Sequence, residues 1–102
     1  MNLKEHLLVV FAEECAETQQ AISKALRLGI KDSCTLPGSE LANSQDIEKE
    51  FIEAMAVRGM LRELGVIVQP SNSKEIYDNK RARVEKYLDL ARKNGTLNKV
   101  ES

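Results

Sequence analysis

Residues 3–28 of the chain are LKEHLLVVFAEECAETQQAISKALRL, a stretch without proline or glycine. Its apolar residues recur every three or four positions, which is the period of an amphipathic helix. Gly29 follows directly and is a typical stop signal. The sequence therefore predicts a long helix over 3–28.

A loop and a second helix are predicted next. Residues 29–44 contain a cluster of Gly, Pro, Ser, Asp and Asn that predicts a long loop, and long loops often serve as lids or binding segments. The helical period returns over 45–64. Asn43 or Ser44 is expected to cap this helix, and Gly65 is expected to end it.

The third helix begins after Pro70. Residues 66–68 could form a short extended piece, although a connector that packs its apolar side chains explains them better. Asn72 and Glu75 have the spacing of a capping pair. They predict a helix that continues to about Asn94, with Gly95 as its stop.

Length and composition fit one domain. The chain has 102 residues, of which 42% are hydrophobic and 4% aromatic, so the core is expected to be aliphatic. We predict a single all-α domain over 1–95 and a frayed tail over 96–102. A domain of this size has a thin stability margin, which oligomerisation would relieve.

Charge and cysteine content exclude several classes of protein. The formal net charge is -1 and both signs are mixed along the chain, so we expect neither a nucleic-acid polymer nor an anionic membrane as a partner. No apolar run is long enough for a signal peptide or a membrane span, which predicts a cytoplasmic protein. Cys15 and Cys34 lack the spacing of a zinc or redox pair and are predicted to be reduced thiols.

Helix 3–28 carries acidic residues where apolar ones are expected. At about 100° per residue, Glu14 falls at the centre of the apolar stripe, and Glu13 and Glu17 lie at its edge. Gln20 and Lys24 continue along that edge, so acids are followed by an amide and an ammonium group. This order suits a metal ion followed by phosphates. The stripe itself consists of Leu3, Leu7, Val10, Ala21, Ala25 and Leu28.

Helix 45–64 repeats the pattern. Glu50 lies in the middle of its apolar stripe, and Glu53 follows one turn later. Glu14 with Glu17 and Glu50 with Glu53 are both spaced i, i+3, which makes each pair neighbours on its helix. The two pairs can converge if the helices pack antiparallel. The stripe of this helix consists of Ile47, Ala54, Val57 and Leu61.

Four carboxylates in an apolar seam need a positive partner, because desolvating each of them costs several kcal/mol. Magnesium takes oxygen ligands and leaves positions open for phosphate, and manganese suits the same ligands. His6 is the single histidine, and with no paired cysteine the residues argue against zinc. Lys80 and Arg83 fall within the apolar side of the third helix, which suggests an anionic ligand.

Structural explanations compete with each of these interpretations. Glu13 can equally be an exposed or salt-bridged side chain at the stripe edge. Lys80 and Arg83 can serve only to neutralise the central glutamates, since such pairing is common for buried charge. The purely structural explanation is weaker for Glu14 and Glu50, because charged residues are almost never fully buried without partners.

The segment 13–17, EECAE, resembles the EExxE motif of the MazG-like, all-alpha nucleoside triphosphate pyrophosphohydrolases, and 50–53, EFIE, stands where that family has ExxD. The chain is similar to small, often phage-borne members over nearly its whole length. The resemblance implies metal ligands at Glu14, Glu17, Glu50 and Glu53. It implies phosphate contacts at Lys24, Asn79, Lys80 and Arg83. Two features depart from the family pattern: Glu53 replaces an aspartate, and the loop between the motifs is long.

The resemblance implies Mg²⁺-dependent hydrolysis of a nucleoside triphosphate to the monophosphate and pyrophosphate. In our hypothesis one or two magnesium ions polarise the phosphates and activate a water. Glu13 orients that water or acts as its base, next to Glu14 as a ligand. The cations of the third helix stabilise the departing pyrophosphate.

The first two helices form only a hairpin, so we predict that a second subunit completes a four-helix core, in a homodimer or homotetramer. A non-catalytic helical adaptor or regulator that keeps this fold is the main alternative function, and the Glu53 departure leaves room for it. An iron-carboxylate bundle is a third hypothesis. It is disfavoured because such bundles place histidine beside their glutamates.

Overall fold

A computed structural model describes residues 1–30 and 41–98 of the chain. These residues contain three helices and no strand, namely α1 (Leu3–Leu28), α2 (Asn43–Glu63) and α3 (Ser73–Lys93). The predicted all-α class is therefore confirmed for the described part of the chain. The chain divides into two compact units, Met1–Val68 with α1 and α2, and Gln69–Ser102 with α3. A single domain over 1–95 stays a prediction.

Both ends of α1 follow from its sequence. Asn2 caps the helix, because its side-chain oxygen accepts a hydrogen bond from the Glu5 backbone N–H at 2.8 Å. The Asn2 amide also donates to the Glu5 carboxylate at 2.9 Å. At the other end Gly29 adopts a φ of 119°, which suits glycine, and its N–H donates to the Ala25 carbonyl at 2.9 Å. The predicted bounds of this helix are confirmed.

The start of α2 differs from the prediction. Ala42 is the capping residue, and its N–H donates to the Gln45 side chain at 3.0 Å. Asn43 is 1% exposed and donates its side-chain amide to the Gly29 carbonyl at 2.6 Å. The prediction of Asn43 or Ser44 as the cap is wrong, because Asn43 lies inside the helix and joins the two helix ends instead.

Gly65 ends α2 as predicted. Its φ of 72° lies in the left-handed region. The Val66 N–H donates to the Leu61 carbonyl at 2.9 Å and the Gly65 N–H to the Arg62 carbonyl at 3.0 Å. This pair of bonds is the Schellman arrangement. The connector 66–68 contains a bend and no strand.

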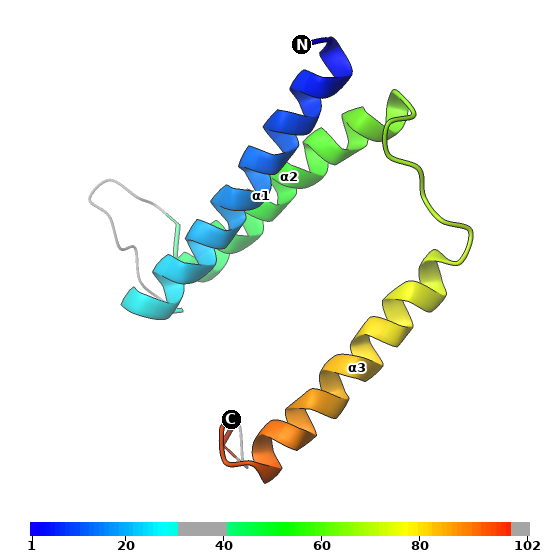
Figure 1. The fold of residues 1–102 in the computed structure, drawn as a ribbon. Coiled ribbons are helices and arrows are strands. Elements are labelled where there is room, and N and C mark those ends of the chain that lie inside the picture. Colours follow the sequence, from blue (N-terminus) through cyan, green and yellow to red (C-terminus); the bar gives the residue numbers. More distant parts are fainter. Residues whose placement is uncertain (31–40, 99–102) are drawn as a thin grey trace. The chain divides into compact units, whose positions relative to one another are not determined.

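Helices α1 and α2 pack against each other as an antiparallel hairpin (Figure 1). Among the described residues, three of the five buried apolar side chains are alanines, and such small side chains permit a close approach of two helices. Leu3 and Leu28, which share the predicted stripe, are 63% and 53% exposed. They lie in the first and last turns of α1, and α2 is shorter, with 21 residues against 26. The buried apolar residues are Leu7, Ala21, Ala25, Ala54 and Leu61.

Helix α3 is amphipathic, but none of its residues, all of which are described, is buried. Asn72 is its capping residue, yet its side chain makes no capping bond with any described residue, so the predicted Asn72–Glu75 pair does not form. The backbone of Asn72 (φ -100°, ψ 34°) is outside the extended region that a side-chain cap requires. Gly95, with a φ of 78°, ends the helix near the predicted position.

Some predictions lie outside the described residues. The loop predicted over 29–44 falls mostly within 31–40, and Cys34 is part of it. The last residues of the predicted tail, 99–102, are also outside. Over the described ranges, no helix combines the length and apolar character that crossing a bilayer requires.

Candidate metal centre

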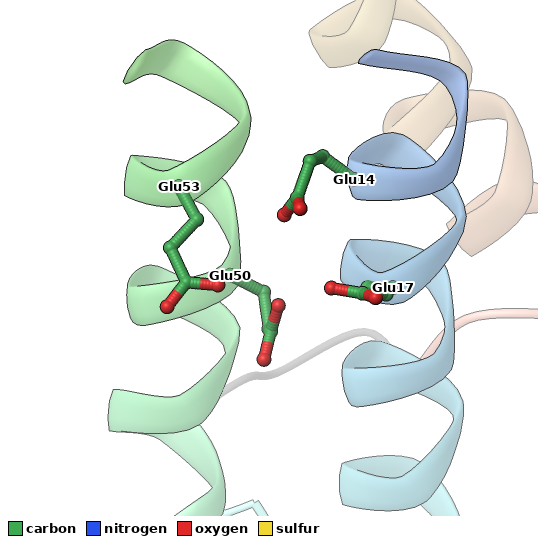
Figure 2. A group of neighbouring side chains, drawn as sticks. All are labelled: Glu14, Glu17, Glu50 and Glu53. Carbon is green, nitrogen blue, oxygen red and sulfur yellow. The ribbon is translucent and has the colours of Figure 1, made fainter. Parts of the chain in front are cut away.

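Four glutamates converge between the two helices of the hairpin. Glu14 and Glu17 project from α1, and Glu50 and Glu53 project from α2 toward the same space (Figure 2). One carboxylate oxygen from each residue lies within 4.8 Å of those of the other three. The convergence that the sequence allowed for antiparallel helices is present in the structure.

The helical repeat explains how the four side chains meet. Residues spaced i, i+3 are neighbours on a helix surface, so each helix presents two carboxylates one turn apart. Glu14 and Glu50 lie nearer the seam, and Glu17 and Glu53 lie on the same flank of it. The buried alanines Ala21, Ala25 and Ala54 add little bulk between the helices.

Two of the eight carboxylate oxygens are buried and unsatisfied. Glu14 Oε2 and Glu50 Oε2 are shielded from solvent, and neither has a hydrogen-bond partner among the described residues. Buried oxygens without partners are rare in folded proteins, because the lost hydration is not replaced. Glu17 is exposed, and the Glu53 side chain is 44% exposed. The cluster thus has a shielded side and an open side.

Burial also affects the ionisation of Glu50. Desolvation raises the pKa of this carboxyl above its ordinary value of 4.5. The ammonium of Lys49 lowers the same pKa, while the carboxylates of Glu53 and Glu17 raise it further. The Glu50 carboxyl therefore resists ionisation in the absence of an additional cation.

Lys49, on α2, is a counter-ion of the glutamate cluster. Its ammonium lies 2.9 Å from Glu53 Oε1 and 3.6 Å from Glu50 Oε1. The hydrogen bond to Glu53 is the main cause of the raised pKa of Lys49. Lys49 was not predicted as a site residue, although the i, i+4 spacing of Lys49 and Glu53 is typical of an ion pair on a helix. Since the Lys49 side chain is 49% exposed, it can leave the carboxylates at small cost.

The donor set fits a hard divalent cation. Carboxylate oxygens are the ligands that magnesium, calcium and manganese prefer. Two opposite ligands of a magnesium ion are about 4.2 Å apart, twice the metal–oxygen distance. The separation of at most 4.8 Å between the four oxygens is close to that value. The two unsatisfied oxygens, Glu14 Oε2 and Glu50 Oε2, are the atoms that gain most from such an ion.

A cavity of about 440 Å³ adjoins the cluster on its open side. At its far end the Lys24 ammonium binds Asp46 Oδ2 across the hairpin at 2.8 Å. Both side chains of this pair are 22% exposed. Asp46 was not among the residues selected from the sequence, although it precedes Glu50 by one turn on the same face. The lining residues are Glu17, Gln20, Ala21, Lys24, Asp46 and Glu50.

The other predicted residues lie elsewhere. Glu13 is exposed on α1 and is not part of the four-carboxylate cluster. Asn79, Lys80 and Arg83 are exposed on α3, in the second unit. Their contact with a substrate stays a prediction.

The opposite side of the hairpin seam is apolar. On each helix, the residues of this side and the outer glutamates lie at opposite edges of the buried stripe. Thr18 and Glu17 show this relation on α1. They form a groove of about 240 Å³. Cys15 in this groove is a free, exposed thiol. We call the following residues the apolar groove: Phe11, Cys15, Thr18, Phe51, Ala54, Met55 and Arg58.

Comparison of the chain with protein-family models, with curated proteins and with solved structures gives no match. The assignment of a function therefore depends on the chemistry of the site and on the motif resemblance.

Proposed function

We propose that this protein is a magnesium-dependent nucleoside triphosphate pyrophosphohydrolase. The observation that carries the proposal is the convergence of Glu14, Glu17, Glu50 and Glu53, with two buried oxygens that lack partners. A resident divalent cation explains both features, since it neutralises the repulsion and satisfies the oxygens.

The surroundings of the carboxylates support the proposed reaction class. Among the described residues, the group that could hold a metal consists of four glutamates and contains no cysteine, so the nucleophile in our proposal is water. A magnesium ion held there would polarise the phosphate chain and lower the pKa of that water. Water then adds across the anhydride between the α and β phosphates, which yields the monophosphate and pyrophosphate.

Residues of the chain supply the remaining steps of the proposal. Glu13 takes the proton of the attacking water or orients it, since it adjoins Glu14 and is exposed to solvent. Phosphate contacts from Asn79, Lys80 and Arg83 are proposed on the family resemblance alone. The positive charges of Lys80 and Arg83 would stabilise the departing pyrophosphate.

Glu53 is the ligand that departs from the family motif. It is the most solvent-accessible partner of Lys49 and already forms an ion pair at 2.9 Å. In the proposal, Lys49 leaves Glu53 when the metal binds, and the longer side chain adjusts to the coordination geometry. Manganese, which prefers the same oxygen ligands, is the proposed substitute for magnesium.

We further propose self-association through the apolar groove. Phe51 and Met55 are 50% and 46% exposed there, and the described residues of the hairpin bury only five apolar side chains. Arg58 is the one charged residue among those that line the groove, so a second copy can face it with little charge repulsion. A homodimer or homotetramer would complete the four-helix core.

The same groove supports a second candidate function. An adaptor that binds an apolar segment of another protein would also use Phe51 and Met55, and it would need no metal. The two functions differ in what the glutamates do. In the adaptor they are a structural or solubilising cluster, and their charge has no catalytic consequence.

The direct test incubates the protein with a panel of nucleoside triphosphates, with magnesium or with a chelator, and follows the products by ³¹P NMR. We expect monophosphate and pyrophosphate only when magnesium is present. Glu50→Gln should abolish the reaction, and Glu48→Gln, which changes an exposed residue outside the cluster, should not. Orthophosphate as the first product would contradict pyrophosphohydrolysis, and no product from any triphosphate would favour the adaptor.

A further inference from the structure

The cavity beside the glutamates has two chemically different ends. Glu17 and Glu50 belong to the cluster, while Lys24 and Asp46 close the cavity further along the same flank of the hairpin. Lys24 follows Glu17 by seven residues, a rise of about 10 Å along the helix. Because α1 and α2 are antiparallel, Asp46 lies at the same end as Lys24. A ligand held at the cluster can therefore reach the ion pair.

The ion pair has little net charge to offer a phosphate. Lys24 Nζ and Asp46 Oδ2 are 2.8 Å apart, so the carboxylate offsets the ammonium at close range. A phosphate at Lys24 would also approach the Asp46 carboxylate, and like charges at that distance repel. Asp46 lies in the first turn of α2, close to the helix N-terminus.

The pair does offer donors and acceptors to a neutral group. The bond between the two residues uses one of the two carboxylate oxygens and one of the three ammonium protons. Gln20, one turn from Lys24, adds an amide that both donates and accepts. At about 440 Å³ the cavity is within the range of small-molecule sites.

We propose that Gln20, Lys24 and Asp46 bind the nucleoside half of the substrate and not its phosphates. This inference deepens the proposed function and rests on it, and it replaces the expected phosphate contact of Lys24. The group recognised on the ligand is a hydrogen-bond donor that lies next to a hydrogen-bond acceptor. Two parts of a nucleoside present it, an amino-bearing edge of the base and the 2′,3′-diol of ribose. Asp46 accepts from the amino group or hydroxyl, and Lys24 donates to the neighbouring oxygen or nitrogen.

The test measures the binding of nonhydrolysable α,β-methylene nucleotides by calorimetry in the presence of magnesium. The cytidine and uridine analogues compare an amino group with a carbonyl at the base edge, which a carboxylate distinguishes. The cytidine and deoxycytidine analogues compare the diol with a single hydroxyl. Inorganic tripolyphosphate reports the phosphate end alone.

For the wild-type protein we expect at least one of these analogue pairs to differ in affinity by about tenfold, the usual value of a hydrogen bond to a charged group. Asp46→Asn and Lys24→Met should bring that ratio close to one, and Lys24→Arg should restore part of it. Tripolyphosphate should bind all of these variants equally. Lys4→Met and Glu48→Gln are the matched controls, because both residues are exposed and outside the cavity lining.

Three results would overturn the inference. Equal wild-type affinities within both analogue pairs would show that the protein does not discriminate between nucleosides. Affinity ratios that stay unchanged in Asp46→Asn would show that the Lys24–Asp46 ion pair does not contact the nucleoside. A phosphate clamp gives a third pattern: Lys24→Met weakens tripolyphosphate binding, and Asp46→Asn, which frees the ammonium, strengthens it. The proposed function fails separately, if the wild-type protein shows no magnesium-dependent binding of tripolyphosphate or of any analogue.

Discussion

The two flanks of the hairpin seam differ in chemistry although the same two helices form both. One flank carries four carboxylates and the Lys24–Asp46 pair, and the other carries the apolar groove. A change of one position along α1, from Glu17 to Thr18, moves from one flank to the other. A short hairpin can thus separate a cluster of carboxylates from an apolar groove by helical phase alone.

The largest effect is expected on the charged flank. Glu14→Gln keeps the shape of the side chain and removes a ligand charge, so turnover should fall by about 100-fold or more. Stability should hold or rise by about 1 kcal/mol, because the new amide can donate to a neighbouring carboxylate. Turnover and the melting temperature measure the two effects. Undiminished turnover would remove the catalytic interpretation of this flank.

The apolar flank should control assembly. Phe51→Glu places a charge in the apolar groove and removes an aromatic side chain, which should weaken association by about 30-fold or more. Light scattering at micromolar concentration should then show monomers for the variant and at least dimers for the wild type. Ile52→Glu is the control, because Ile52 is similarly exposed, at 55%, but is not part of the groove. Equal dissociation by both variants would show that association is not confined to the groove.

The pH dependence of stability should report on the charged flank, because Glu50 is the residue expected to titrate differently on folding. Folding raises the pKa of Glu50 above its ordinary value of 4.5. At a pH between the pKa of the unfolded state and that of the folded state, the folded protein therefore binds more protons than the unfolded protein. The metal-free protein should therefore lose stability as the pH rises through that window. Saturating magnesium should reverse the slope, because metal binding requires the ionised carboxylates.

Melting curves of wild type and Glu50→Gln over pH 4 to 8, in steps of about half a unit, would measure this effect. The variant should show a flatter dependence without metal and a smaller response to magnesium. Identical curves for the two proteins would mean that Glu50 does not titrate differently on folding.

The smallest effect concerns a position outside both flanks. Gly59 is within α2, and a Cβ added there would meet no described heavy atom within 4 Å. Gly59→Ala should stabilise the protein by about 0.5–1 kcal/mol through helix propensity, and raise the melting temperature by a few degrees. Turnover and oligomeric state should not change. A loss of stability would locate Gly59 in a subunit contact and extend the association surface beyond the groove.

Much of the fold is readable from the sequence because its signals are local. The end of α1 at Leu28 and the ends of α2 and α3 follow from glycines that take a positive φ or complete a Schellman turn. The start of α2 was not predictable in this way, because Asn43 forms a tertiary bond to Gly29. A local capping rule has no information on such a bond.

The candidate site was predictable only in part, for a similar reason. Helical phase placed Glu14 and Glu50 toward the seam, and the i, i+3 spacing gave their partners. Lys49 could have been found by its spacing from Glu53. Asp46 could not, because its significance depends on Lys24, 22 residues away in sequence and on the other helix.

The bond between Asn43 and Gly29 fastens the hairpin at the point where the chain leaves one helix and enters the next. Because the bond joins the C-terminal end of α1 to the first residue of α2, it constrains the register in which the carboxylates of the two helices meet.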